Sequence, residues 1–384
     1  MRLLVFLFAC LLTVSAAYLT MGGGSLGSTP QLAFPVASAA GVSASPSSAQ
    51  PQFKVGVYYF PGWRDRTPHA PSDFPWEPVK RFAEREPALG WYDEGSVAVM
   101  QSQINTMAAN GLSYVMFDWY WGTDNQVYLD HALKAFRQVE DRRGLQFGLL
   151  WANHDGAPAS IDNFDKMVAY WIVNYFTAPE YLRVDGKPVV IVFSAEQFDR
   201  DARRFGSDPT QLMARANEQA RSAGIPGIYF VAGAQSDEPN FVRFAQPSSG
   251  YSAVTAYNLH WLPGASHPSH SYQELDAAYR SHWHRYETLG GLPVIYPMSS
   301  GWDKRPWGGS TDDPKHDDSV GTPDEFEAHV RAGVAEMLKS PSPRLGVVCC
   351  WNEFGEGSYI EPTKQMGAAV VERLGRVLKA GGAP

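Results

Sequence analysis

Eight short apolar runs, separated by longer stretches with helical patterning, constrain the fold of this chain more than any other sequence feature. The runs occupy residues 53–60, 113–119, 145–151, 188–194, 227–232, 252–257, 293–298 and 345–351. Near-continuous apolar runs such as Val-Val-Ile-Val-Phe at 189–193 are typical of parallel strands that are buried on both faces. The stretches between the runs predict helices at 96–110, 125–143, 161–178, 209–223, 272–289, 323–340 and 364–379.

Strands that alternate with helices indicate βαβ units, and eight such units favour closure into a barrel. No Gly-x-Gly-x-x-Gly or Walker sequence opens the first helix, which argues against an open nucleotide-binding sheet. The interval 235–250 is only weakly helical. We therefore predict an α/β protein with a single (β/α)8 TIM barrel.

The chain divides into three parts of different composition. Arg2 precedes an apolar stretch at 3–14, so residues 1–17 are predicted to be a signal peptide. Residues 18–52 are rich in Gly, Ser, Ala and Pro, which predicts a flexible low-complexity linker. Residues 53–384 are predicted to form the catalytic barrel.

The N-terminal segment also predicts where the protein resides. Its small residues predict cleavage near Ala16 or Ala17, and its apolar stretch is short for a membrane span. We expect a secreted or periplasmic protein with no stable membrane span in its mature form. An uncleaved anchor is a less favoured alternative, and so is a lipoprotein anchor at Cys10, because Phe8 fits a lipoprotein sequence poorly.

Composition excludes several classes of partner. The net charge is −8 and no Lys/Arg run stands out, so no nucleic-acid partner is expected.

Cys349 and Cys350 are adjacent in a predicted strand and should point to opposite faces, which predicts a mature protein without disulfides. No metal-binding or cofactor motif is present, so neither is predicted. The histidines at 267, 270, 282 and 284 and the acidic loop 312–318 are interpreted as solvated.

Candidate substrate-binding residues follow the predicted strands, because active sites of such barrels lie at the carboxyl ends of the strands. Aromatic rings can cover the C–H faces of sugars there, and amides and carboxylates can bind hydroxyls; the alternative is that these residues brace the barrel or fill its core. Tyr59, Trp119, Trp151 and Trp302 are expected to border one pocket. The candidates are Tyr59, Asp118, Trp119, Tyr120, Trp151, Asn153, His154, Tyr257, Trp302 and Asn352.

The segment that follows the eighth run carries paired carboxylates. Glu353 and Glu356 lie three residues apart, and Gly355 and Gly357 free the backbone to turn both into one pocket. Asn352 could orient a carboxylate by hydrogen bonding. Neighbouring carboxylates can acquire different pKa values and act as acid and base, which glycoside cleavage requires.

The same segment resembles a known family. Residues 351–362 (Trp-Asn-Glu-Phe-Gly-Glu-Gly-Ser-Tyr-Ile-Glu-Pro) are similar to the signature of glycoside hydrolase family 99 and its family 99-like (WbsX-type) relatives of bacterial polysaccharide loci. Similar segments occur at 57–61, 111–120 and 181–189, so the resemblance covers the folded domain. Phe354-Gly355 stands where the family hydrolases usually carry Trp-His, which separates this pocket from that of the mannosidases.

The resemblance implies a mechanism. Glu353 would deprotonate the 2-hydroxyl of the sugar, which attacks C1 to give a 1,2-anhydro sugar. Glu356 would protonate the leaving oxygen and then activate water, with net retention. We therefore expect a glycoside hydrolase that acts on an oligosaccharide or polysaccharide. The alternatives are a transglycosylase or glycosyltransferase of polysaccharide assembly and a non-catalytic carbohydrate-binding protein.

Overall fold

The computed structural model describes residues 53–64, 76–153, 156–341 and 343–381, which belong to one compact unit, Gln50–Pro384. The predicted signal peptide, the predicted linker and His154 lie outside the described residues. Within the described part, no helix is both long enough and apolar enough to cross a membrane.

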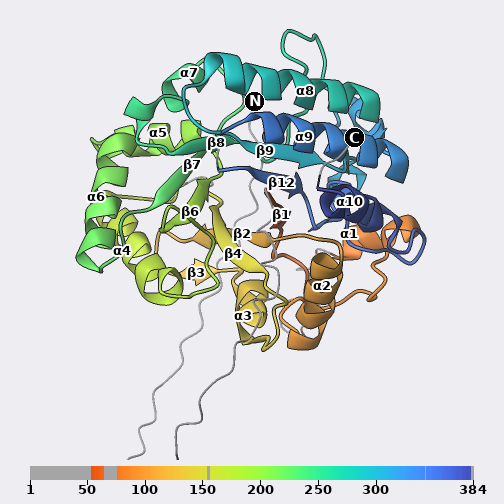
Figure 1. The fold of residues 1–384 in the computed structure, drawn as a ribbon, viewed down its shortest axis with the longest axis horizontal. Helices are drawn as coiled ribbons and strands as arrows, with labels where there is room; N and C mark the ends of the chain where they lie inside the picture. Colours follow the sequence, from red (N-terminus) through yellow and green to blue (C-terminus); the bar gives the residue numbers. More distant parts are fainter. Residues whose placement is uncertain (1–52, 65–75, 154–155, 342, 382–384) are drawn as a thin grey trace, which may run out of the picture. The chain divides into compact units, whose positions relative to one another are not determined.

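Eight parallel strands form the centre of this unit (Figure 1). They pair in the order β8-β7-β6-β4-β2-β1-β12-β9, and a parallel bridge between Val254 and Val294 links the two ends of that order. The predicted TIM barrel is therefore confirmed, and each expected run overlaps one barrel strand. The strands are β1 (Lys54–Tyr59), β2 (Tyr114–Trp121), β4 (Gln146–Trp151), β6 (Lys187–Val192), β7 (Tyr229–Gly233), β8 (Ala253–Thr255), β9 (Ile295–Ser299) and β12 (Leu345–Cys349).

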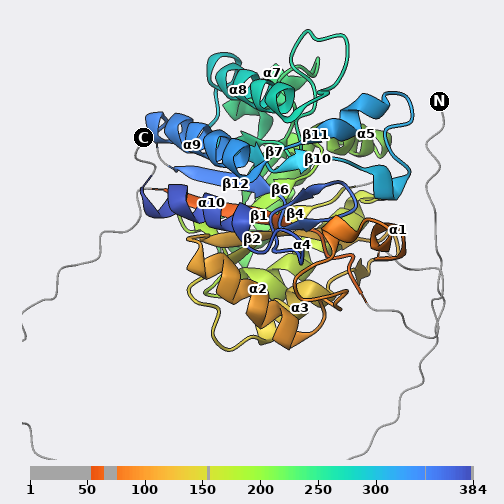
Figure 2. The ribbon, with the colours of Figure 1, turned by 90° about the vertical axis from the view of Figure 1, so that its right-hand side faces the viewer.

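Helices surround these strands on the outside (Figure 2). Each predicted helical stretch contains a helix: α2 (Val97–Ala109), α3 (His131–Gln138), α4 (Ile161–Trp171), α6 (Pro209–Ser222), α8 (Tyr272–Leu289), α9 (Pro323–Lys339) and α10 (Ala369–Lys379). Sequence patterning did not predict α1 (Trp76–Lys80), α5 (Ala195–Arg204) or α7 (Phe241–Phe244). The Ser194 side chain accepts a hydrogen bond from the Gln197 backbone N–H and thereby caps α5.

Alternation along the strands divides the core into two layers. Tyr58, Met116 and Leu150 belong to the cluster inside the barrel, whereas Tyr59 and Phe117 pack in the larger cluster between sheet and helices. Both layers are apolar, as expected for a parallel sheet covered on each face.

Short antiparallel pairs shape the loops at the barrel mouth. The strands β10 (Gly301–Trp302) and β11 (Ser319–Val320) pair after β9, and β13 (Asn352–Glu353) pairs with β14 (Ser358–Tyr359) after β12. Two more short strands, β3 (Val127–Tyr128) and β5 (Arg183–Val184), pair with β2 and β6.

The cysteine prediction was wrong. Cys349 and Cys350 form a disulfide with each other, and both are fully buried inside the barrel. Strand alternation sets opposite side-chain directions only within a strand, and β12 ends at Cys349. The direction of Cys350 is therefore set by the loop that follows.

Three residues expected to be solvated are buried: His282, His316 and Asp317. His282 lies on the face of α8 that carries Leu275, Tyr279 and Tyr286, and its ring nitrogens bond the Ser236 hydroxyl and a backbone carbonyl. Spacings of three and four residues place these side chains on one face of a helix, which here packs on the barrel. In the loop 312–318, Asp317 is buried and accepts hydrogen bonds from the Lys304 and Ser310 backbone N–H groups.

Candidate active site

The paired glutamates occupy the two ends of one turn. Glu353 is the second residue of β13, and the backbone N–H of Glu356 donates to the Glu353 carbonyl at 3.1 Å. Gly357 has φ +73°, the left-handed conformation that favours glycine. Gly355 is required for a steric reason, because a Cβ there would lie 2.0 Å from the indole of Trp307. The two glycines of the turn therefore have different roles.

A cluster of carboxyl groups forms around Glu353. Tyr257, which follows β8, lies with its hydroxyl 2.9 Å from Glu353 Oε1 and 3.1 Å from Oδ2 of Asp118 on β2. Burial raises the pKa of Glu353 well above its usual range, and the charges of Glu356 and Asp118 raise it further. Burial likewise raises the pKa of Asp118 well above its usual range, with a further contribution from Glu356. At both residues the Tyr257 hydroxyl opposes this rise in pKa, because its hydrogen bond stabilises the ionised carboxylate.

Glu356 differs from Glu353 in its surroundings. Burial raises the pKa of Glu356 to about 7, and the nearby charge of Lys304 opposes this rise. The side chain is partly exposed and lines a cavity of about 290 Å³. A carboxyl group with a pKa near neutrality can both donate and accept a proton in this pH range.

An ion pair holds the turn in place. The buried guanidinium of Arg85 bonds the Asp303 carboxylate and donates to the Phe354 carbonyl at 2.7 Å. The Asp303 backbone N–H donates to the Glu356 carbonyl at 2.7 Å. These contacts fix the backbone on both sides of Glu356, and sequence analysis identified neither Arg85 nor this role of Asp303.

Two expected substrate-binding asparagines bind backbone instead. The Asn352 side chain accepts from the Phe60 N–H and donates to the Phe60 carbonyl, both at 2.9 Å. Asn153 makes the same reciprocal pair with Ser194, also at 2.9 Å. Each amide thereby links a strand end to the end of the neighbouring strand. Asn352 and Asn153 are buried, and the bonds of their side chains go to backbone groups rather than to a carboxylate, which differs from the expected role of Asn352.

Three of the four expected pocket aromatics lie elsewhere. Tyr59, Trp119 and Trp151 belong to the cluster between sheet and helices, where Tyr59 donates to Gln103 at 2.9 Å and both indoles pack against Trp171. They occupy outward positions of their strands, and this corrects their expected placement. Trp302 does line the cavity with Glu356.

Asp118 and Tyr120 take the inward positions on the strand that also carries Trp119. The charges of Asp118, Glu353 and Glu356 all act on the Tyr120 hydroxyl, and burial, the largest cause, raises its pKa well above the usual range. Of the predicted binding residues, the structure thus brings Asp118, Tyr120, Tyr257 and Trp302 together with the glutamates.

The cavity beside Glu356 also contains a carboxylate that the sequence analysis missed. Glu238, in the loop after β7, lines it together with Asn258 and His260. Burial raises the pKa of Glu238 to about 7, and the charge of Glu196 adds to the effect. The interval 235–250 carried no motif, so only its length and weak patterning marked it as a loop.

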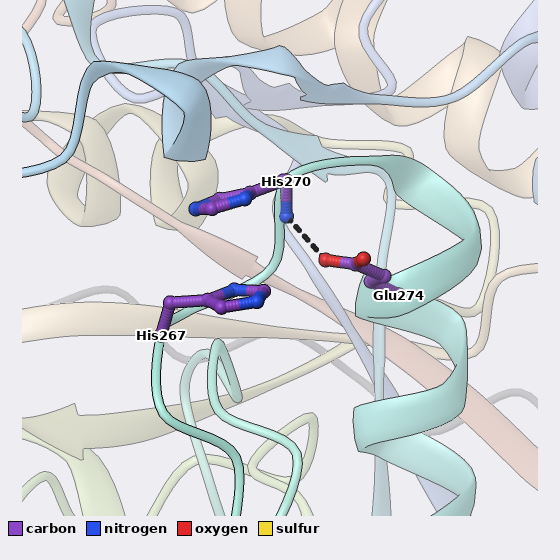
Figure 3. A group of neighbouring side chains, drawn as sticks. All are labelled: His267, His270 and Glu274. Carbon is purple, nitrogen blue, oxygen red and sulfur yellow. Dashed lines mark hydrogen bonds between the residues drawn. The ribbon is translucent and has the colours of Figure 1, made fainter.

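Among the residues that the structure describes, His267, His270 and Glu274 are close enough to share a metal ion (Figure 3). The two imidazole rings are stacked with centroids 4.0 Å apart and planes 12° apart. A nitrogen lone pair lies in the plane of its ring, so stacked parallel rings do not direct theirs at one ion. His270 also bonds Asp313 through Nε2 at 2.7 Å, and the group supports no cofactor assignment.

Two solved structures with similar folds are described as a glycoside hydrolase and a glycoside hydrolase-like protein. The GH99 endo-alpha-mannosidase from Bacteroides thetaiotaomicron, in complex with BIS-TRIS-Propane, is 13% identical with a TM-score of 0.62, over 86% of this chain and 97% of that one. A glycoside hydrolase-like protein is 14% identical with a TM-score of 0.61, over 89% of this chain and 97% of that one. At such identities the likeness establishes the barrel fold alone.

Curated relatives match at the level of sequence. The uncharacterized protein WxcX of Xanthomonas campestris pv. campestris is 26% identical over 314 residues in two strains, covering 76% of this chain. The match spans only 42% of the length of those relatives. Residues 83–374 match the family model described as glycosyltransferase WbsX, which confirms the resemblance found at 351–362. The chain therefore belongs to the WbsX glycosyltransferase family.

Proposed function

We propose that this protein is a glycoside hydrolase that cleaves an oligosaccharide or polysaccharide with retention, through a 1,2-anhydro sugar. The observation that carries the proposal is the coupled carboxyl cluster at the barrel mouth, in which Glu353 and Glu356 occupy one turn beside Asp118 and Tyr257. The expected mechanism requires one carboxylate and one carboxylic acid, and mutual repulsion between buried carboxyl groups favours such a mixed state.

The shared tyrosine suggests how the proton is distributed. The Tyr257 hydroxyl has a single proton but lies within hydrogen-bonding distance of both Asp118 and Glu353. Both contacts are satisfied when protonated Asp118 donates to the tyrosine oxygen and the tyrosine donates to ionised Glu353. In this arrangement Glu353 is the base toward the sugar 2-hydroxyl, and Asp118 is a positioning residue that acts through Tyr257.

Glu356 is proposed as the general acid. In its protonated form it donates to the leaving oxygen, and the resulting carboxylate accepts a proton from the water that attacks C1 of the anhydro sugar. As the C1–O2 bond breaks, Glu353 returns to the 2-oxygen the proton that it took in the first step. The pKa of about 7 is suited to both steps. Attack by the 2-hydroxyl requires it to lie trans to the leaving group, which permits α-manno or β-gluco substrates and forbids α-gluco ones.

A transglycosylase is the second candidate, favoured by the description of the family as glycosyltransferases. The two activities share the first step and differ only in whether water or a sugar hydroxyl opens the anhydro intermediate. Product analysis with and without an added acceptor sugar separates them.

The test compares Glu353→Gln and Glu356→Gln with Glu218→Gln, an exposed residue of α6 paired with Arg221. Once a screen of polysaccharides provides a substrate, each active-site variant should lower turnover about 100-fold or more while binding is retained. Glu218→Gln should leave turnover unchanged. Near-normal turnover by both active-site variants would exclude the assignment. Normal cleavage of a 2-deoxy substrate would exclude the 1,2-anhydro sugar as intermediate. The assignment of the two glutamates as catalytic residues would still stand.

A further inference from the structure

The cavity beside Glu356 is bounded by loops from one half of the barrel mouth. Its walls come from the segments that follow β6, β7, β8, β9 and β12, represented by Ser194, Glu238, Asn258, Trp302 and Glu356. Its volume of about 290 Å³ is near the lower end of the range for small-molecule sites, roughly 300–1,000 Å³. It therefore has room for a small part of a glycan rather than a long segment.

Three buried polar atoms of its lining residues have no hydrogen-bond partner within the described part of the chain. They are Asn258 Nδ2, His260 Nδ1 and Trp302 Nε1. Asn258 and Trp302 are each only 9% exposed. Asn258 Oδ1 already accepts from the hydroxyls of Tyr279 and Ser299, which leaves its amide donors for another partner. Unpaired buried polar groups are uncommon in proteins, and the presence of three on residues of one cavity favours a polar ligand there.

Glu238 supplies the complementary acceptor. Its backbone N–H donates to the Gln235 carbonyl at 3.1 Å, which holds the loop, and its carboxylate accepts no hydrogen bond from any described side chain. Burial favours a neutral His260, because it lowers the pKa of this ring to about 3. The residues that line the cavity include two glutamates and no Lys or Arg.

We propose that this cavity binds one uncharged sugar unit of the substrate, and that Glu238 is a specificity-determining residue that accepts a hydrogen bond from a hydroxyl of that unit. Asn258 and Trp302 donate to other oxygens of the same unit. The inference deepens the proposed function and rests on it. Because the walls carry two carboxyl groups and no Lys or Arg, they offer no cation to pair with a uronic acid, and ionised Glu238 repels one.

The experiment measures binding in a chain that cannot turn over its ligand. Glu353→Gln serves as the parent, because Glu353 does not line the cavity. Uncharged hexose oligosaccharides and oligouronates of equal length are titrated by calorimetry into the parent and into the parent with Glu238→Ala, Trp302→Phe or the control Glu218→Gln. Thermal unfolding of each variant confirms that it is folded.

The parent should bind an uncharged oligosaccharide and reject the oligouronate. Glu238→Ala should weaken that binding about 10-fold or more, as expected for a lost hydrogen bond to a charged group. It should also reduce the difference in affinity between the uncharged oligosaccharide and the oligouronate. Trp302→Phe keeps an aromatic ring of smaller size and removes the N–H donor, so it should weaken binding less than Glu238→Ala. Glu218→Gln should have no effect.

Equal binding by the parent and by Glu238→Ala would overturn this inference, and so would preference for the oligouronate. Failure of the proposed function has a different result: Glu353→Gln, with Glu238 intact, would bind the oligosaccharide but turn it over as fast as the unmodified chain. Absence of binding to every glycan would contradict both proposals.

Discussion

Replacement of Gly355 by alanine tests how the turn between the two glutamates is packed. A Cβ at this position would lie 2.0 Å from Cε2 and Nε1 of Trp307 and 2.4 Å from its Cζ2. The indole must therefore move by more than an ångström. Trp307 lies nearly parallel to Trp63, with planes 7° apart and centroids 6.1 Å apart, so the movement disturbs an aromatic contact beside the active site.

The expected cost follows from two opposing effects. Overpacking of this kind costs about 1–3 kcal/mol, and we expect the lower half of that range because Trp307 is 40% exposed and can swing outward. Gly355 does not have a left-handed backbone conformation. Alanine by itself should therefore stabilise the folded state by about 0.4–1 kcal/mol, because it lowers the conformational entropy of the unfolded chain. With Trp307 removed, Gly355→Ala should therefore be neutral or stabilising.

A double-mutant cycle measures this coupling. Denaturant unfolding is compared for the unmodified chain, Gly355→Ala, Trp307→Ala and the double variant. We expect a coupling energy of about 1–2 kcal/mol between the two positions, equal to the overpacking cost. If Gly355→Ala changes the unfolding free energy equally in both backgrounds, within about 0.5 kcal/mol, then Trp307 is not what requires glycine here.

Three further predictions concern other parts of the chain. Burial raises the pKa of Glu361 to about 8 from its usual 4.5, so the folded state holds this proton more tightly than the unfolded chain. The resulting stabilisation is complete below about pH 4.5 and is lost as the pH rises through about 8. Glu361→Gln should therefore make the unfolding free energy fall less steeply over that interval, and an unchanged slope would contradict the assignment. Asn352→Ala leaves the Phe60 N–H and carbonyl unpaired, which should cost about 1–3 kcal/mol per buried group in denaturant unfolding; a loss below about 0.5 kcal/mol would show that the bridge is replaced by water. Finally, protein made in a secreting bacterial host should begin near Ala16 or Ala17 by mass spectrometry, and an intact N-terminus would refute the signal peptide.

Much of the barrel could be predicted from the sequence because its physical signals are local. Each strand is a continuous apolar run, and the stretches between the runs have helical periodicity, so both the number and the order of the strands follow. Glu353 and Glu356 were identified for a similar reason. Their spacing, the adjacent glycines and the family signature all lie within residues 351–362.

The tertiary structure decided which residues face the site. In a parallel barrel both faces of a strand are buried, so the pattern of polar and apolar residues does not show which face points inward. Asp118 points to the carboxyl cluster, whereas its neighbour Trp119 packs beneath a helix. The sequence likewise could not show that Asn352 is used by the backbone of Phe60, nearly 300 positions earlier, because that contact exists only when the first and last strands become neighbours. Glu238 has no motif around it, and only closure of the barrel brings its loop to the cavity of Glu356. Local patterning thus determined the positions of the strands and helices and of the acidic pair in the sequence. Closure of the barrel, and the face of each strand that points inward, determined which residues contact that pair.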